Sequence, residues 1–120
     1  MRQRQSKKGG GVSISVSICF MDIYHIWCNL KDGVKDLEFT DAEQRYFDYL
    51  KGDGRLQAYL ITRRKLGLGP SHLPEFHIML EFENLAQMDK AFAHVSSRGD
   101  PVEGFHQAVN SKVKEIFFAL

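Results

Sequence analysis

The chain has 120 residues, 43% of them hydrophobic and 26% charged, and a net charge of +1. These values are typical of one globular domain, and they exclude a strong charge that would select nucleic acid or an anionic membrane surface. No run approaches the roughly 20 apolar residues of a membrane-spanning helix. Two cysteines, Cys19 and Cys28, make no disulfide framework, so we expect free thiols and a cytoplasmic protein.

Residues 1–20 differ in composition from the rest of the chain. Four basic residues crowd the first eight positions, and a short apolar stretch interrupted by serines follows. The stretch resembles an export signal but lacks a clear cleavage site. We interpret residues 1–20 as a flexible or non-native leader, with Met21 as an alternative start. Residues 21–120 are then one domain, which is cut short at its C-terminus if the apolar run ending at Leu120 normally continues.

The first predicted strand covers residues 21–30, and its residues alternate between two faces. Ile23, His25, Trp27 and Asn29 share one face of it. A turn follows, and then a helix that begins at Asp36 or Thr40 and ends near residue 51. The apolar stripe predicted for this helix consists of Phe39, Ala42, Tyr46, Tyr49 and Leu50.

Two further strands are predicted over residues 55–65 and 75–83, joined by a loop that holds two glycines and two prolines. The later strand has a wholly apolar face, and its opposite face carries His77, Met79 and Glu81. In the earlier strand we assign Tyr59, Ile61 and Arg63 to the face opposite the core, together with Gln57.

The last part of the chain predicts two helices and a strand. Asn84 is a typical N-cap for a helix that ends before Gly99. Asp100 and Pro101 open a short third helix. Residues 112–120 form the final strand, in which we place Val113, Glu115, Phe117 and Ala119 on one face.

The order of elements is therefore β-α-β-β-α-β, with an added helical turn before the last strand. Right-handed crossovers fold this order into one antiparallel sheet with strand order 4-1-3-2 and both main helices on one side. This is an α+β, ferredoxin-like architecture in which the first and third strands are central neighbours.

The sheet face turned away from the helices is expected to be too apolar for solvent. Apolar patches on monomers rarely exceed a few hundred Å², and a second copy related by a two-fold axis is the simplest cover. We therefore expect a homodimer through this outer face. Its predicted apolar members are Ile23, Trp27, Tyr59, Ile61, Met79, Val113 and Phe117.

A chain of this length, element order and half-apolar outer face resembles the dimeric α+β barrel superfamily over residues 21–120. Within that group it is similar to uncharacterised small bacterial proteins, on the stretches 67–70, 84–87, 100–104 and 110–113. The resemblance implies the fold and dimerisation. It also implies that a small organic ligand lies inside the barrel or between sheet and helices, and it includes cofactor-independent monooxygenases and isomerases.

His25 and His77 are the candidate catalytic residues, because imidazole titrates near neutral pH. The candidate ligand-binding residues around them are Trp27, Asn29, Tyr59, Arg63, Met79 and Glu81. The opposing interpretation is a non-enzymatic homodimer whose interface contains the two histidines. Arg63 begins a basic run that could grip an anion, or it could be a solvated strand end.

Metal, cofactor and RNA sites are the weaker alternatives. Two histidines with Glu81 or Glu115 could supply the ligands of an open metal site, but they come from different strands, so spacing cannot test the idea. We expect no metal and no cofactor. RNA-binding modules share this topology, but the acidic ends of the 75–83 strand disfavour phosphate, so we expect no nucleic-acid partner.

Overall fold

The computed structural model describes residues 2–7, 14–19 and 21–120, with side chains from Met21 onward. From there to the C-terminus the elements run β3 (Asp22–Leu30), α1 (Asp36–Gly52), β4 (Ala58–Arg63), β5 (Phe76–Phe82), α2 (Leu85–Ser96), α3 (Val102–Asn110) and β6 (Val113–Ala119). The strands form an antiparallel sheet in the order β4-β5-β3-β6. This is the predicted order 4-1-3-2 read from the opposite edge, so the predicted α+β topology is confirmed.

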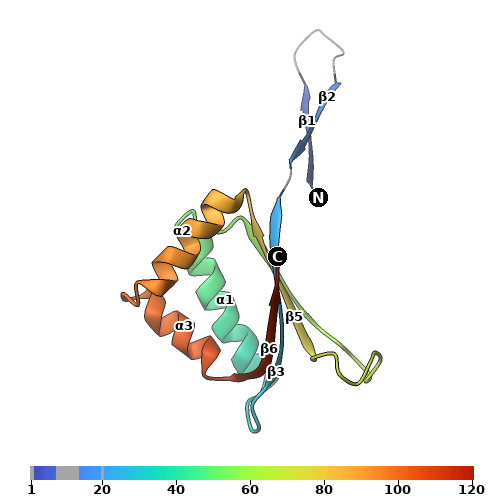
Figure 1. The fold of residues 1–120 in the computed structure, drawn as a ribbon, viewed down its shortest axis with the longest axis vertical. Coiled ribbons are helices and arrows are strands. Elements are labelled where there is room, and N and C mark those ends of the chain that lie inside the picture. Colours follow the sequence, from blue (N-terminus) through green and yellow to red (C-terminus); the bar gives the residue numbers. More distant parts are fainter. Residues whose placement is uncertain (1, 8–13, 20) are drawn as a thin grey trace.

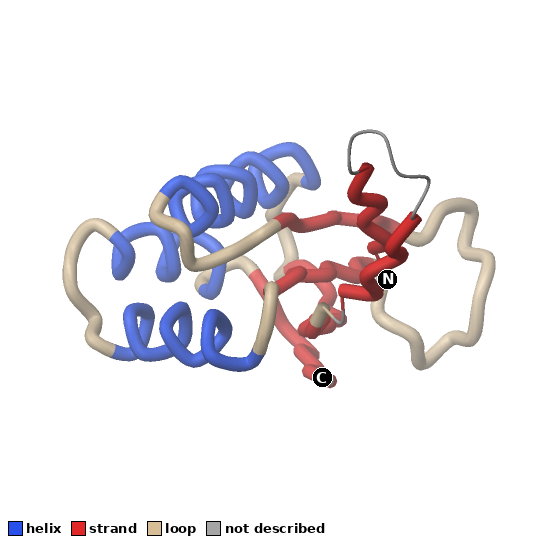
Figure 2. Tube along the Cα trace, turned by 90° about the horizontal axis from the view of Figure 1, so that it is seen from above, coloured by secondary structure: helices blue, strands red, loops and turns tan. Residues whose placement is uncertain are grey.

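The molecule has two layers in this region. The helices cover one face of the four-stranded sheet, and the loop between β4 and β5 projects on the opposite side (Figure 1). The view from above shows the same separation of helices and strands (Figure 2). Throughout the part of the chain that the structure describes, no helix is long and apolar enough to cross a membrane.

The N-terminal residues add a second, two-stranded sheet. β1 (Arg2–Lys7) pairs antiparallel with β2 (Ile14–Cys19), and residues 8–13 lie outside the described residues. The side chain of Cys19 is outside them too, whereas Cys28 is a buried free thiol. The interpretation of residues 1–20 as a flexible or non-native leader stays a prediction.

The core lies between the helices and the two central strands. Alternate residues of β5 are buried on the helix side, where Phe76 packs edge-on against Phe39 of α1 with ring centroids 5.0 Å apart. The N-cap predicted for the second helix is confirmed, since Asn84 Oδ1 accepts a hydrogen bond from the Gln87 backbone N–H at 2.8 Å. The cap satisfies one of the amide groups that a helix leaves unpaired at its start.

The faces predicted for β4 are wrong. Tyr59 lies opposite Leu80 and Ile61 opposite Ile78, so both point to the helix side, and Arg63 follows the same alternation. The prediction placed Leu56, Ala58 and Leu60 together on the core face. Leu56 is buried, but it precedes the first residue of β4, so its burial does not determine which strand residues face the core. Leu60, 54% exposed, occupies the outer face instead.

The face predicted for Val113 is also wrong, because β6 contains a β-bulge. The register of β6 against β3 shifts between Trp27 and Asn29, and Glu115 adopts a φ of 53°. The extra residue reverses the alternation. Val113 therefore lies opposite Leu30 in the core, whereas Phe117 stays on the outer face opposite Trp27, as predicted.

We predict that Phe39→Ala lowers the free energy of unfolding by about 3–5 kcal/mol, because it empties a fully buried site in a packed core. Leu37→Ala is the matched control, since Leu37 lies two residues away in α1 and is 77% exposed. The control should change stability by less than about 0.5 kcal/mol. Urea denaturation of both variants measures this, and equal losses would contradict the packing described.

Candidate functional site

The outer face brings three of the sequence-predicted residues together in one aromatic stack. His25 Nδ1 lies 2.9 Å from His77 Nε2, a hydrogen bond in which one nitrogen donates and the other accepts. The Trp27 indole stacks on the His77 imidazole with centroids 4.6 Å apart and planes 6° apart. Partial burial and the neighbouring His25 lower the pKa of His77 below its ordinary value. A neutral His77 is therefore favoured in this stack.

The other predicted residues of this face surround the stack. Asn29 Nδ2 donates to Glu115 Oε2 at 2.7 Å, and Asn29 Oδ1 accepts from the Glu75 backbone N–H at 2.8 Å. Met79 lies opposite His25, and Glu81 lies opposite Ile23. Asn29 is thus held by neighbouring groups of its own chain.

Tyr59 and Arg63 are separated from this cluster by the sheet. The Tyr59 hydroxyl donates to Asp48 Oδ1 of α1 at 2.8 Å. The Arg63 guanidinium pairs with Glu75 at 2.8 Å and also with Asp36. Among the described residues, no group of three or more His, Cys, Asp or Glu side chains is arranged to hold a metal ion.

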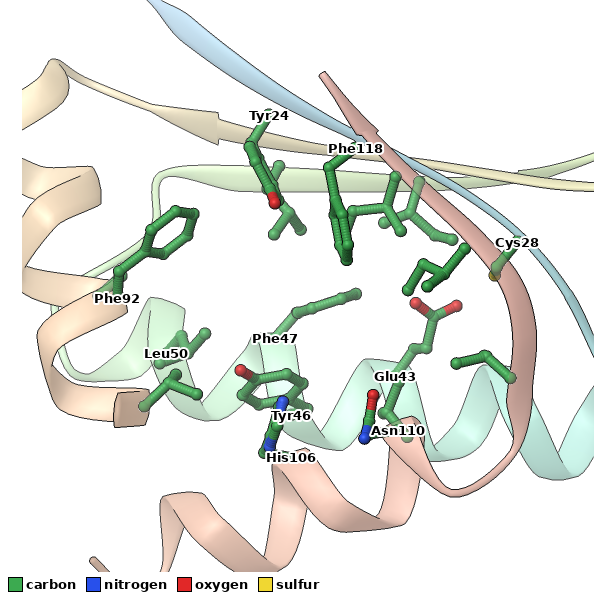
Figure 3. Close-up of a pocket in the computed structure, with 18 of the residues that line it drawn as sticks. Tyr24, Cys28, Glu43, Tyr46, Phe47, Leu50, Phe92, His106, Asn110 and Phe118 are labelled. Carbon is green, nitrogen blue, oxygen red and sulfur yellow. The ribbon is translucent and has the colours of Figure 1, made fainter. Parts of the chain in front are cut away.

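The helix side contains a cavity of about 260 Å³ between the sheet and the helices. Tyr24 and Phe118 wall it from the sheet, and Tyr46, His106 and Asn110 from α1 and α3 (Figure 3). Tyr24 stacks with Phe118 at 5.6 Å and meets Phe92 of α2 edge-on at 5.1 Å. Phe92 and Phe118 are 38% and 54% exposed, so they stand where the cavity meets solvent.

A carboxyl group reaches into this cavity from α1. Glu43 is 1% exposed, and its side chain points from the helix toward the sheet, on the side of Cys28 (Figure 3). Its Oε1 atom is buried without a hydrogen-bond partner among the described residues. Burial raises the pKa of Glu43 to about 8, because a low-dielectric site disfavours the charged form.

The groups near this carboxyl are also shifted toward their neutral forms. Burial, and to a smaller extent the nearby Glu43, raises the pKa of the Cys28 thiol to about 12. Burial and then Glu103 raise the pKa of Tyr46 to about 12. Cys28 is therefore a poor nucleophile, since the thiolate is the reactive form.

Glu43 is the residue that reasoning from the sequence missed. It was absent from the stripe predicted for the helix, where the fully buried positions are Phe39, Glu43, Phe47 and Leu50. The signal was available, because Glu43 stands four residues after Phe39 and four before Phe47, which places it among core residues. Tyr46 and Tyr49 are instead partly buried toward α3, where Tyr49 packs on Phe105 at 5.2 Å.

A buried carboxyl that titrates near neutral pH can do two things. When protonated it donates a hydrogen bond to an acceptor, and when ionised it accepts a proton. Strongly shifted groups in cavities are enriched at functional sites. The cavity around Glu43 is thus a second candidate site, on the opposite side of the sheet from the histidines.

Residues 21–120 match the model of a family of unknown function, DUF6614. The chain belongs to this family. The matched region contains the whole four-stranded sheet, its three helices and both candidate sites. No protein with curated information matches the DUF6614 chain significantly.

Solved structures share the fold of this DUF6614 protein at low sequence identity. An Arabidopsis thaliana protein is 13% identical, with a TM-score of 0.63 over 81% of this chain and 89% of its own. A dimeric ferredoxin-like protein of unknown function from Jannaschia is 12% identical, with a TM-score of 0.55 over 83% of this chain and 96% of its own. A dimeric protein of unknown function with a ferredoxin-like fold, from Bacteroides fragilis, is also 12% identical. Its TM-score is 0.52 over 82% of this chain and 92% of its own. The predicted resemblance to ferredoxin-like proteins that form dimers is confirmed at the level of the fold.

We predict that Glu43 makes stability fall as pH rises. Its pKa is about 8 in the folded protein against an ordinary 4.5, so between these values the folded state keeps a proton that the unfolded state releases. The contribution of Glu43 to the free energy of unfolding is then fully present below about pH 4.5. It is lost as the pH rises to about 8, by at most about 1.4 kcal/mol per pH unit. Urea denaturation across this range should show the loss in the natural protein and not in Glu43→Gln. If the free energy of unfolding changed with pH in the same way in both proteins, the buried, protonated carboxyl would be contradicted.

Proposed function

We propose that this protein is a homodimer that binds a small organic molecule in the cavity between the sheet and the helices. The observation that carries the proposal is Glu43, a buried carboxyl with one oxygen lacking a hydrogen-bond partner among the described residues, in a cavity with mainly apolar walls. Binding sites commonly combine such walls with a few polar groups that fix the ligand's orientation. Proton transfer to or from a bound molecule, without a cofactor, is the enzymatic extension of this proposal.

The outer face supports the homodimer. Leu60 and Phe117 are 54% and 56% exposed on it, next to the stack of Trp27 and the two histidines. Two proteins of similar fold are described as dimeric. A second copy packed on this face would bury these side chains and complete the architecture of a dimeric α+β barrel.

The outer face is also the alternative ligand site, with His25 and His77 as its catalytic candidates and Trp27, Asn29, Met79 and Glu81 around them. The cavity is favoured because its carboxyl oxygen lacks a hydrogen-bond partner among the described residues, whereas Asn29 is already bonded to Glu75 and Glu115. In a homodimer without enzymatic activity, the histidines and Trp27 would serve as interface residues only.

Mapping by NMR distinguishes the two ligand sites. We expect small aromatic fragments to shift the backbone amide signals of cavity residues such as Phe47 and Val109. The single tryptophan, Trp27, supplies one indole N–H signal that reports on the outer face. Fragments that shift the Trp27 signal and leave the cavity signals unchanged would place the ligand site on the outer face instead.

Charge at the outer face should break the dimer. We predict that Phe117→Glu weakens self-association by at least about 100-fold, because the dimer would then bury two unpaired carboxylates. Leu37→Glu is the control, since Leu37 is 77% exposed on α1 in the helix layer. Sedimentation equilibrium measures both variants. A monomeric natural protein, or a Phe117→Glu protein that dimerises normally, would refute this interface.

A further inference from the structure

The walls of the cavity restrict the charge of what it can hold. Among the described residues that line it there is no lysine and no arginine. The titratable side chains facing it are Glu43, Cys28, Tyr24, Tyr46 and His106. An anionic ligand would therefore enter a mainly apolar space with no permanent positive charge and with a carboxyl group inside it. Desolvation and the ionised form of Glu43 both oppose that ligand.

The cavity also restricts size and shape. A dry apolar cavity of about 150 Å³ binds benzene, and this one measures about 260 Å³. One aromatic ring with a short substituent therefore fits. Aromatic side chains around the space suit edge or stacked contacts with such a ring. They include Tyr24, Tyr46, Phe47, Phe92 and Phe118.

Glu43 supplies the selective contact. At neutral pH its carboxyl is predominantly protonated, because burial raises its pKa to about 8, so it carries an O–H donor. Cys28, with a pKa raised to about 12, stays a neutral thiol beside it. A ligand oxygen that accepts a hydrogen bond would satisfy a polar group that the described protein leaves unpaired.

We infer that the cavity selects neutral, mostly apolar molecules of about one ring whose carbonyl or hydroxyl oxygen accepts a hydrogen bond from the Glu43 carboxyl, given the ligand site proposed above. Anions are rejected. Ammonium ligands are disfavoured at neutral pH, since they require Glu43 to ionise in an apolar space and bring three N–H donors that need partners.

Four small probes test this selectivity on the full chain by NMR titration. Acetophenone carries a neutral carbonyl, ethylbenzene lacks a polar group, benzoate is an anion and benzylamine is a cation. Near pH 6 we expect acetophenone to bind more tightly than benzoate or benzylamine. Between about pH 7 and about pH 9 its affinity should fall about tenfold, as the protonated fraction of Glu43 declines.

Two substitutions separate the hydrogen bond from the shape of the cavity. Glu43→Gln keeps a donor of similar size, and it should keep acetophenone binding while removing the pH dependence. Glu43→Leu removes the donor, and the affinity ratio of acetophenone to ethylbenzene should fall about tenfold, the loss expected for one hydrogen bond of about 1.4 kcal/mol. Comparing this ratio between proteins cancels much of any change in cavity size.

The outcomes separate the ligand class from the ligand site. If ethylbenzene shifts the cavity signals but the ratio is the same in the natural protein and Glu43→Leu, the inferred class is wrong and the site stands. Tighter binding of benzoate or benzylamine than of acetophenone near pH 6 would also overturn the class. If all four probes leave the cavity signals unchanged at millimolar concentration, the proposed site itself fails.

Discussion

The strict alternation of β5 is the constraint on which the rest of this structure depends. Phe76, Ile78, Leu80 and Phe82 are at most 5% exposed and face the helices, while His77, Met79 and Glu81 face the other way. Because β5 pairs with both β4 and β3, its register sets which residues of its neighbours lie in each layer. The cavity and the histidine stack are thus two sides of one pattern, separated by a single sheet.

Glu43 departs from the pattern that stabilises the core. Leaving a buried polar group without a partner costs about 1–3 kcal/mol, and an apolar residue would fill the same place in α1 more cheaply. Proteins break local rules of this kind mainly at functional or strained sites. The buried residues around Glu43, among them Phe39, Phe47 and Leu50, stabilise a helix that can tolerate the carboxyl.

Much of the architecture follows from local patterns in the sequence, and the failures occur where tertiary geometry overrides them. The third predicted strand is correct because its alternation is unbroken. The faces of Tyr59 and Val113 were wrong, since one depends on where β4 starts and the other on a bulge that no residue type announces. The meeting of His25, Trp27 and His77 followed from strand order and parity. The cavity did not, because its volume depends on how far α1 and α3 stand from the sheet.

The bulge in β6 sets which face of the sheet each residue after it occupies. Without the bulge, plain alternation from Val113 would turn Phe117 inward and Phe118 outward. The position of Glu115 also depends on the bulge. In the observed strand its carboxylate is exposed and accepts a hydrogen bond from Asn29. Without the bulge, the same carboxylate would point into the core, away from Asn29. The bulge therefore places Phe118 in the cavity wall and keeps the Glu115 carboxylate on the other side of the sheet, outside the cavity.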